Sequence, residues 1–207
     1  MATMSMNKAI HGAVRRDLAR FRTALAQFPE GDKSRGAALG RAWANFDDQL
    51  EHHHHGEHEI AWPALRELGV SQALLTTLDD EHDTMAAALA RARTAMEFLA
   101  RTGTGSISAV NAIAELESVT IAHLLHEEAE LEPVFLANAG SEVLKKMGRE
   151  FGKVSPARGG RFFAWVLDGA SPDERAAAAG SIPPPVLTII GGVFGAPYRL
   201  RIAPVWR

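Results

Sequence analysis

Apolar residues recur every three or four positions along four long stretches of this chain. Such spacing predicts an amphipathic helix with one inward stripe of apolar side chains. The predicted helices cover 5–28, 37–68, 71–102 and a last segment that starts at 106 or 108 and ends at 139. Gly and Pro separate them. Long helices joined by short loops favour an all-α fold, an antiparallel up-down-up-down four-helix bundle.

Polar residues interrupt the apolar stripe of every predicted helix. The stripe of the second helix continues past them to Ile60, and that of the fourth helix continues to Glu130 and Val134. A polar side chain on an inward stripe needs a buried partner. The six interruptions are His11 on the first helix, His53 and Glu57 on the second, His82 on the third, and His123 and Glu127 on the fourth.

The loop positions predict that these six side chains lie at one level. Measured from Asp32 in the first turn, His11 lies 21 residues back and His53 lies 21 residues forward. Measured from Gly103 in the third turn, His82 lies 21 residues back and His123 lies 20 forward. At about 1.5 Å per residue, each is roughly 30 Å from its loop. The sequence therefore predicts one polar cluster inside the bundle.

Imidazole and carboxylate donors in this number favour a metal site. An all-nitrogen-and-oxygen set suits iron, manganese or zinc better than copper(I). Six donors exceed one tetrahedral zinc and suit two metals, with each Glu able to bridge. A ferritin-like site is disfavoured because it uses Glu-x-x-His pairs, whereas here each His precedes its Glu by four residues. A metal-free polar layer is the alternative, but burying these groups without a cation is costly.

The remaining third of the chain has a different pattern. After Gly140, short segments are broken by Gly and Pro, which divides the chain into a bundle at 1–140 and a C-terminal helical extension at 141–207. Pro183 to Pro185 predicts a rigid spacer. The stretch 186–198 is too apolar to remain free, so we expect the extension to pack on the bundle or to form a homodimer contact.

Composition narrows the classes of function. A net charge of −3 gives no reason to expect nucleic acid or an anionic membrane as partner. The absence of Cys excludes disulfides and thiolate sites. The first residues lack an apolar signal core, and no apolar run approaches the length of a membrane span, so a cytoplasmic location is expected.

Four motifs give the chain a resemblance to a known family. They are IHGAVRRDL at 10–18, HHHGEHEIAWPAL at 53–65, DEHDTMAAAL at 80–89 and HLLHEEAELEP at 123–133. Over roughly 8–137 the chain resembles the hemerythrin-like, or HHE cation-binding, family, and its C-terminal region is similar to tails of actinobacterial members. The resemblance implies a four-helix bundle with two iron ions joined by an oxo or hydroxo bridge. It also implies terminal ligands at His11, His53, His82 and His123, with Glu57 and Glu127 as bridges.

One position departs from the family pattern. Oxygen-carrying hemerythrins place two His one turn apart on the third helix, whereas Leu78 stands one turn before His82 here. The seventh ligand is then His54, next to His53, with His126, Tyr198 or water as alternatives. His58 and His126 are expected to support the Glu carboxylates from outside. His52 and His55 are expected on the surface.

Three functions are compatible with such a centre. The first is a module that binds or senses O2, NO or reactive oxygen species and reports through the C-terminal segments. The second is a catalase-like enzyme that decomposes H2O2, for which the missing ligand on the third helix would leave an additional open position. The third is iron handling without redox chemistry. Whether the protein is an enzyme stays open at this point.

Overall fold

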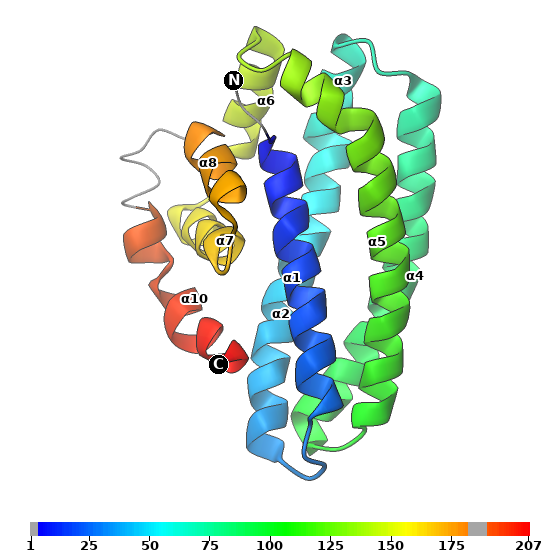
Figure 1. Ribbon diagram of the computed structural model, residues 1–207, viewed down its shortest axis with the longest axis vertical. Helices are drawn as coiled ribbons and strands as arrows, with labels where there is room; N and C mark the ends of the chain where they lie inside the picture. Colours follow the sequence, from blue (N-terminus) through cyan, green and yellow to red (C-terminus); the bar gives the residue numbers. More distant parts are fainter. Residues whose placement is uncertain (1–3, 182–189) are drawn as a thin grey trace.

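The computed structural model describes residues 4–181 and 190–207, and these ranges contain helices and no strand. Four long helices lie lengthwise beside one another (Figure 1): α1 (Met6–Ala26), α2 (Lys33–Gly56), α4 (Gln72–Thr102) and α5 (Ser106–Ala137). A π-helical segment, η1 (Glu57–Ala61), continues α2 into α3 (Trp62–Glu67). The prediction of an all-helical protein is confirmed.

The ends of the long helices follow from local chemistry. The side chains of Ser5, Asp32 and Ser71 accept hydrogen bonds from backbone N–H groups in the first turns of α1, α2 and α4. Gly103 ends α4 with a φ of 71°, and a Cβ there would lie 2.7 Å from the backbone nitrogen of Lys33. The turn after α4 therefore needs glycine for both its conformation and its close approach to α2.

The apolar stripes predicted from the sequence form the core. Val14, Leu18 and Phe21 of α1 are buried, and the rings of Trp43 and Phe46 on α2 pack against Phe21. On α4 every apolar residue of the predicted stripe is buried. These residues are Leu75, Leu78, Met85, Leu89, Ala92, Met96 and Leu99. Burial of these stripes is the main stabilising contribution to the bundle.

The predicted helix at 37–68 contains a π-helical segment, and its predicted stripe is wrong at Ile60. Pro63 has no N–H, so it cannot donate a hydrogen bond to the carbonyl of Glu59. The backbone N–H of Trp62 donates to the carbonyl of Glu57, five residues earlier, which makes a π turn. The wider turn inserts one residue, so Ala61 is buried where the stripe predicted Ile60, which is half-buried. The chain therefore changes its inward face directly after Glu57.

The inward face of α5 also departs from the prediction after Glu127. Glu130 is exposed and Val134 is half-buried, whereas Leu131 and Phe135 are buried. Alternating steps of three and four average 3.5 residues, and a helix with 3.6 residues per turn drifts away from that repeat. Pro133 lies inside α5, and Figure 1 shows the helix bending near this end.

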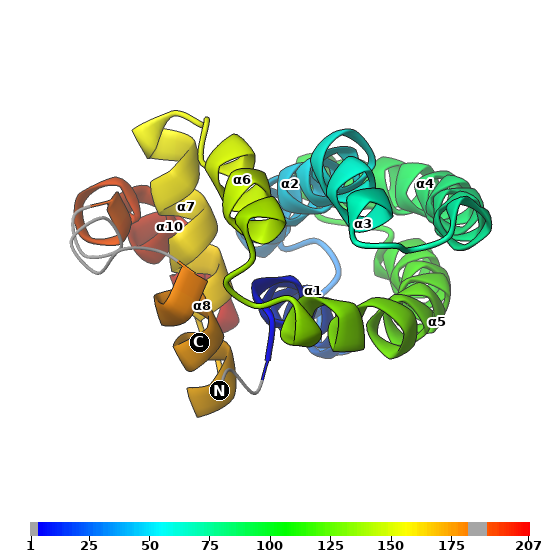
Figure 2. The ribbon, with the colours of Figure 1, turned by 90° about the horizontal axis from the view of Figure 1, so that it is seen from above.

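The C-terminal extension lies along the side of α1 and α2 away from α4 (Figure 2). It contains α6 (Glu142–Phe151), α7 (Pro156–Leu167), α8 (Pro172–Ser181), η2 (Ile190–Phe194), α10 (Ala196–Arg201) and η3 (Ala203–Trp206). Trp165 is buried and donates from Nε1 to Oδ2 of Asp17 at 2.8 Å, and Trp206 packs edge-on against Phe21. The extension thus covers α1 and α2 of its own chain.

Three further predictions concern this extension. The spacer at Pro183 to Pro185 lies outside the described residues. A homodimer contact and the division at residue 140 stay predictions. Among residues 4–181 and 190–207, no helix is both long enough and apolar enough to cross a membrane.

Candidate metal centre

Four helices and the π segment bring seven side chains together inside the bundle. Each predicted site residue is among them. They are His11 on α1, His53 and His54 in the last turn of α2, Glu57 at the start of η1, His82 on α4, and His123 and Glu127 on α5. Their donor atoms fall into two groups of four, and within each group the atoms lie within 4.8 Å of one another.

The first group lies where α1, α2 and α5 meet, and it is buried throughout. It contains His11, His53, Glu57 and Glu127. Nε2 of His11 lies 3.2 Å from Nε2 of His53 and 3.3 Å from Oε2 of Glu127. Nε2 of His53 lies 3.1 Å from Oε1 of Glu57, which is four residues later and therefore on the same face of the helix.

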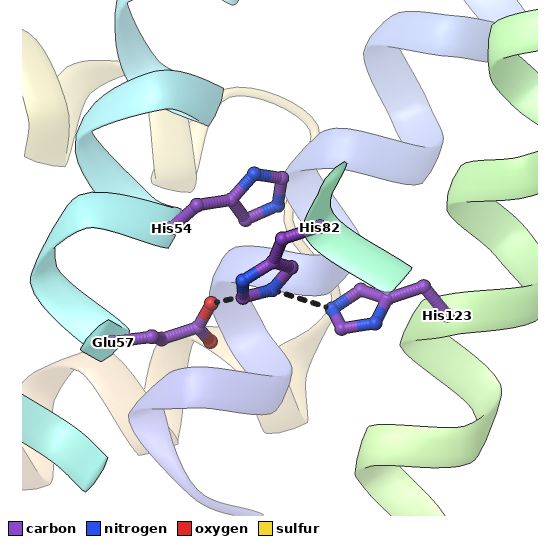
Figure 3. A group of neighbouring side chains, drawn as sticks. All are labelled: His54, Glu57, His82 and His123. Atoms are coloured by element: carbon purple, nitrogen blue, oxygen red, sulfur yellow. Dashed lines mark hydrogen bonds and ion pairs between the residues drawn. The ribbon is translucent and has the colours of Figure 1, made fainter. Parts of the chain in front are cut away.

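The second group lies where α2, α4 and α5 meet (Figure 3) and contains His54, Glu57, His82 and His123. Nε2 of His82 lies 3.0 Å from Nε2 of His123 and 3.4 Å from Oε2 of Glu57. The ring of His54 stacks on that of His82, with centroids 4.2 Å apart and planes at 19°. His54 therefore provides a second imidazole beside His82, although it comes from α2.

Carboxylates connect the two groups. Glu57 belongs to both, with Oε1 toward His53 and Oε2 toward His82. Oε2 of Glu127 lies 3.3 Å from Nε2 of His11 and 3.4 Å from Nε2 of His123, one histidine in each group. Each carboxylate thus faces imidazoles of both donor groups.

Two outer carboxylates orient the histidines. Nδ1 of His11 lies 3.0 Å from Glu128, and Nδ1 of His123 lies 2.8 Å from Glu81. A carboxylate accepts the Nδ1 proton, so each Nε2 turns a lone pair toward the centre. Sequence reasoning missed Glu81 and Glu128, although each directly neighbours a predicted ligand.

Asn7 and Asp79 complete the surroundings. Asn7 stands one turn before His11 and donates from Nδ2 to Oε1 of Glu127 at 2.8 Å. Nε1 of Trp62 donates to Oδ1 of Asp79 at 2.7 Å, and the indole ring lies nearly parallel to the ring of His82. The spacing of Asn7 from His11 is the one sequence signal that could have indicated its role.

Burial and neighbouring charges shift the pKa values in opposite directions. Burial and the Glu127 charge raise the pKa of Glu57 well above its usual value. Burial acts in the same direction on Glu127, but His11, His123 and His53 outweigh it and lower the pKa of that carboxyl well below its usual value. Burial, followed by the neighbouring His123, lowers the pKa of His82 to about 4. Burial and neighbouring imidazoles also lower the pKa values of His53 and His54.

Most of these shifts fit a cation-binding cluster. The lowered pKa values of His53, His54, His82 and Glu127 favour the neutral imidazoles and the carboxylate that a metal requires. Two groups differ, because the pKa of Glu57 is raised and because Glu127 and Glu128, against the effect of burial, raise the pKa of His11, so both would release a proton when a cation binds.

Four polar atoms of the cluster are buried without a hydrogen-bond partner among the described residues. They are Oε1 and Oε2 of Glu57, Oε2 of Glu127 and Nε2 of His54. Buried donor atoms without partners are costly, and a cation between them would remove that cost. The residues therefore fit a metal.

The other candidate residues lie outside the cluster. His126 lies 2.7 Å from Glu81, and His58 lies 3.3 Å from Asp79. The expectation that these two histidines support Glu57 and Glu127 is wrong, since they contact outer carboxylates instead. The hydroxyl of Tyr198 donates to Asp168 at 3.1 Å, inside the extension, so Tyr198 is not a ligand. His55 is exposed as expected, whereas His52 is half-buried.

Comparisons with known proteins bear on this site. Neither the search of curated proteins nor the search of solved structures gave a match. A family model, the hemerythrin HHE cation binding domain, matches residues 5–135, which include all seven side chains of the cluster. That span is more than half of the chain. The protein belongs to the hemerythrin HHE cation-binding domain family.

Proposed function

We propose that the protein is a non-heme di-iron protein that binds or senses O2, NO or reactive oxygen species. The proposal includes an up-down-up-down bundle, as in hemerythrins, as the scaffold of the centre. The observation that carries it is the pair of donor groups that share Glu57 and face each other across Glu127. One cation would need only one group, whereas two groups with shared carboxylates suit two cations.

The proposed ligand set assigns each residue one role. His11 and His53 would hold one iron, and His54, His82 and His123 would hold the other. Glu57 and Glu127 would bridge the two. When bound, the iron pair would supply one-electron redox chemistry and open positions for a small ligand. Glu81 and Glu128 would hold the histidines in the tautomer that turns Nε2 inward.

A contact between the extension and the last residue of α2 favours sensing. Phe151 of α6 lies directly on Gly56, where a Cβ would come within 2.5 Å of its Cε1 atom. Gly56 immediately precedes the shared Glu57. A change in the position of that carboxylate that moves the backbone at Gly56 would therefore displace Phe151 of α6. This contact supports a binding or sensing module that reports through the C-terminal segments.

The peroxide-decomposing alternative depended on an additional open position beside His82. His54 stacks there with Nε2 inside the second donor group, which removes the reason to expect that position open. Iron handling without redox chemistry is the other alternative. With that argument removed, we favour binding of a small molecule over turnover of peroxide.

The experiment compares ligand binding with peroxide decomposition on one sample. The full chain is loaded with ferrous iron without oxygen, freed of unbound iron, and exposed separately to NO, O2 and H2O2. We expect new absorption bands with NO and with O2, and no oxygen evolution from H2O2 above that of the same amount of free iron. Rapid oxygen evolution would favour the catalase-like alternative, and an iron-loaded protein without any spectral response would favour iron handling.

A further inference from the structure

The two sides of the candidate metal centre differ in exposure. On the side of α1, the side chains of His11 and Glu127 are 0% and 1% exposed. On the side of α4, His82 is 11% exposed, and Glu81 and His126 beside it are 32% and 36% exposed. Among these side chains, exposure to solvent is therefore greatest on the side of α4 and α5, next to His82.

The two sides also differ in charge. Around His82, α4 carries Asp79, Asp80, Glu81 and Asp83, and none of these forms an ion pair with Lys or Arg within the part of the chain described. On the opposite side, Arg15 lies 2.6 Å and Lys8 3.7 Å from Glu128. A cation that approaches the centre is attracted along α4, whereas on the side of α1 the charge of Glu128 is neutralised by Arg15 and Lys8.

Two histidine–carboxylate pairs connect the acidic face of α4 to the cluster. Glu81 contacts half-buried His126 with Oε1 at 2.7 Å and buried His123 with Oε2 at 2.8 Å. Asp79 lies 3.3 Å from Nδ1 of exposed His58 and 3.8 Å from Nδ1 of His82. Both pairs offer the nitrogen and oxygen donors that a divalent transition metal prefers.

A buried donor without a partner lies beneath these pairs. Nε2 of His54 is buried, has no hydrogen bond among the described residues, and belongs to the second donor group with His82 and His123. It is independent of the surface acids, since it comes from α2. Nitrogen and oxygen donors thus continue from His58 at the surface to the unpartnered Nε2 atom of His54 inside the bundle.

We propose that Asp79, Asp80, Glu81 and Asp83, with His58 and His126, form the entry face through which divalent metal cations reach the centre. This inference rests on the proposed function to the extent that the cluster takes up a metal. Asp80 and Asp83 are exposed and act by attraction alone. The pairs His58–Asp79 and His126–Glu81 capture the cation and pass it inward to His82 and His123.

Uptake kinetics test the entry face without any measurement of activity. The metal-free full chain is mixed rapidly with Co2+ at low ionic strength, and the visible absorption of bound Co2+ is followed in time. The variant Asp80→Asn/Asp83→Asn removes two charges that touch no candidate ligand. We expect its uptake rate to fall at least about threefold, with the same final absorption. The difference should disappear at about 0.5 M salt, because salt screens exposed charges.

A matched control removes two acids elsewhere. Glu142→Gln/Glu150→Gln changes the net charge equally, on α6 side chains that are 79% and 41% exposed, and should leave the uptake rate unchanged. His126→Ala should slow uptake while the final absorption stays, as expected of a capture residue. An unchanged rate in Asp80→Asn/Asp83→Asn, or equal slowing in the α6 control, would overturn the entry face. Absence of any Co2+ absorption in the wild type would instead contradict the proposed metal centre.

Discussion

His54 stacks on His82, with ring centroids 4.2 Å apart, although the two residues come from different helices. The Nε2 atom of His54 is buried without a hydrogen-bond partner among the described residues, which is unfavourable unless a cation binds there. His54 adjoins His53, and the two imidazoles point into different donor groups. Two successive residues of α2 thus contribute to two donor groups, which the proposed function assigns to two metals.

Replacement of His54 tests this division. In His54→Ala, the group with His82 and His123 loses one of its four donors, while the buried group with His11 and His53 keeps all of its own. We expect the metal content to fall from about two ions per chain toward one, measured by elemental analysis after loading without oxygen. His55→Ala is the matched control, because His55 is exposed and should retain full content. Equal losses in both variants would show that the helix presents other residues inward.

Removal of the metal should loosen the centre and leave the helices. Each long helix has a buried apolar stripe away from the centre, and that burial holds the fold without metal. The converging lone pairs of the cluster would then be unpaired, at a cost of several kcal/mol in total, roughly. We expect chelation to lower Tm by about 10 °C with little change in far-ultraviolet circular dichroism. Loss of helicity on chelation would mean that the metal, not the core, holds the bundle.

The hydrogen bond from Trp165 to Asp17 should contribute to the stability of the contact between the extension and α1. Trp165→Phe removes the Nε1 donor and leaves Asp17, a buried carboxylate, with Arg20 as its remaining hydrogen-bond donor. We expect a loss of about 1–3 kcal/mol in the free energy of unfolding, measured by denaturant titration. Trp206→Phe is the control, because the Nε1 atom of Trp206 has no partner among the described residues. A larger loss from Trp206→Phe would show that packing area, not the hydrogen bond, fixes the extension.

Deletion of 141–207 separates the extension from the metal centre. All seven candidate ligands precede Gly140, so the shortened chain should still bind metal. Its α1 and α2 would lose the cover that Trp165 and Trp206 provide, and we expect aggregation or a change of oligomeric state in size-exclusion chromatography. A soluble shortened chain of unchanged oligomeric state would refute the covering role. Loss of metal would make the extension part of the centre.

Much of the fold was predictable because one physical signal repeats along each helix. Steps of three and four placed Val14, Leu39 and Met96 inside, and all three are buried. The same steps led into His53 and His123, whose Nε2 atoms face the cluster. The stripe failed at Ile60 because the π turn before Pro63 adds a residue, which a fixed period cannot represent.

The outer residues were beyond the reach of periodicity. Glu81 and Glu128 lie beside the inward stripes, and only the angles between helices bring them against His123 and His11. The place of Tyr198 depended on how short helices pack, and its bond to Asp168 inside the extension has no sequence signature. His54 was predictable only through the family resemblance, since a ligand missing at Leu78 had to come from elsewhere.

The central claim is a two-metal centre joined by Glu57, and the iron content of the chain tests it most directly. The full chain and Glu57→Ala are loaded with ferrous iron without oxygen, freed of unbound metal, and analysed for iron and protein. We predict about two iron ions per wild-type chain and loss of most iron in Glu57→Ala, because Glu57 serves both donor groups. One ion per wild-type chain, or full iron retention in Glu57→Ala, would contradict the account.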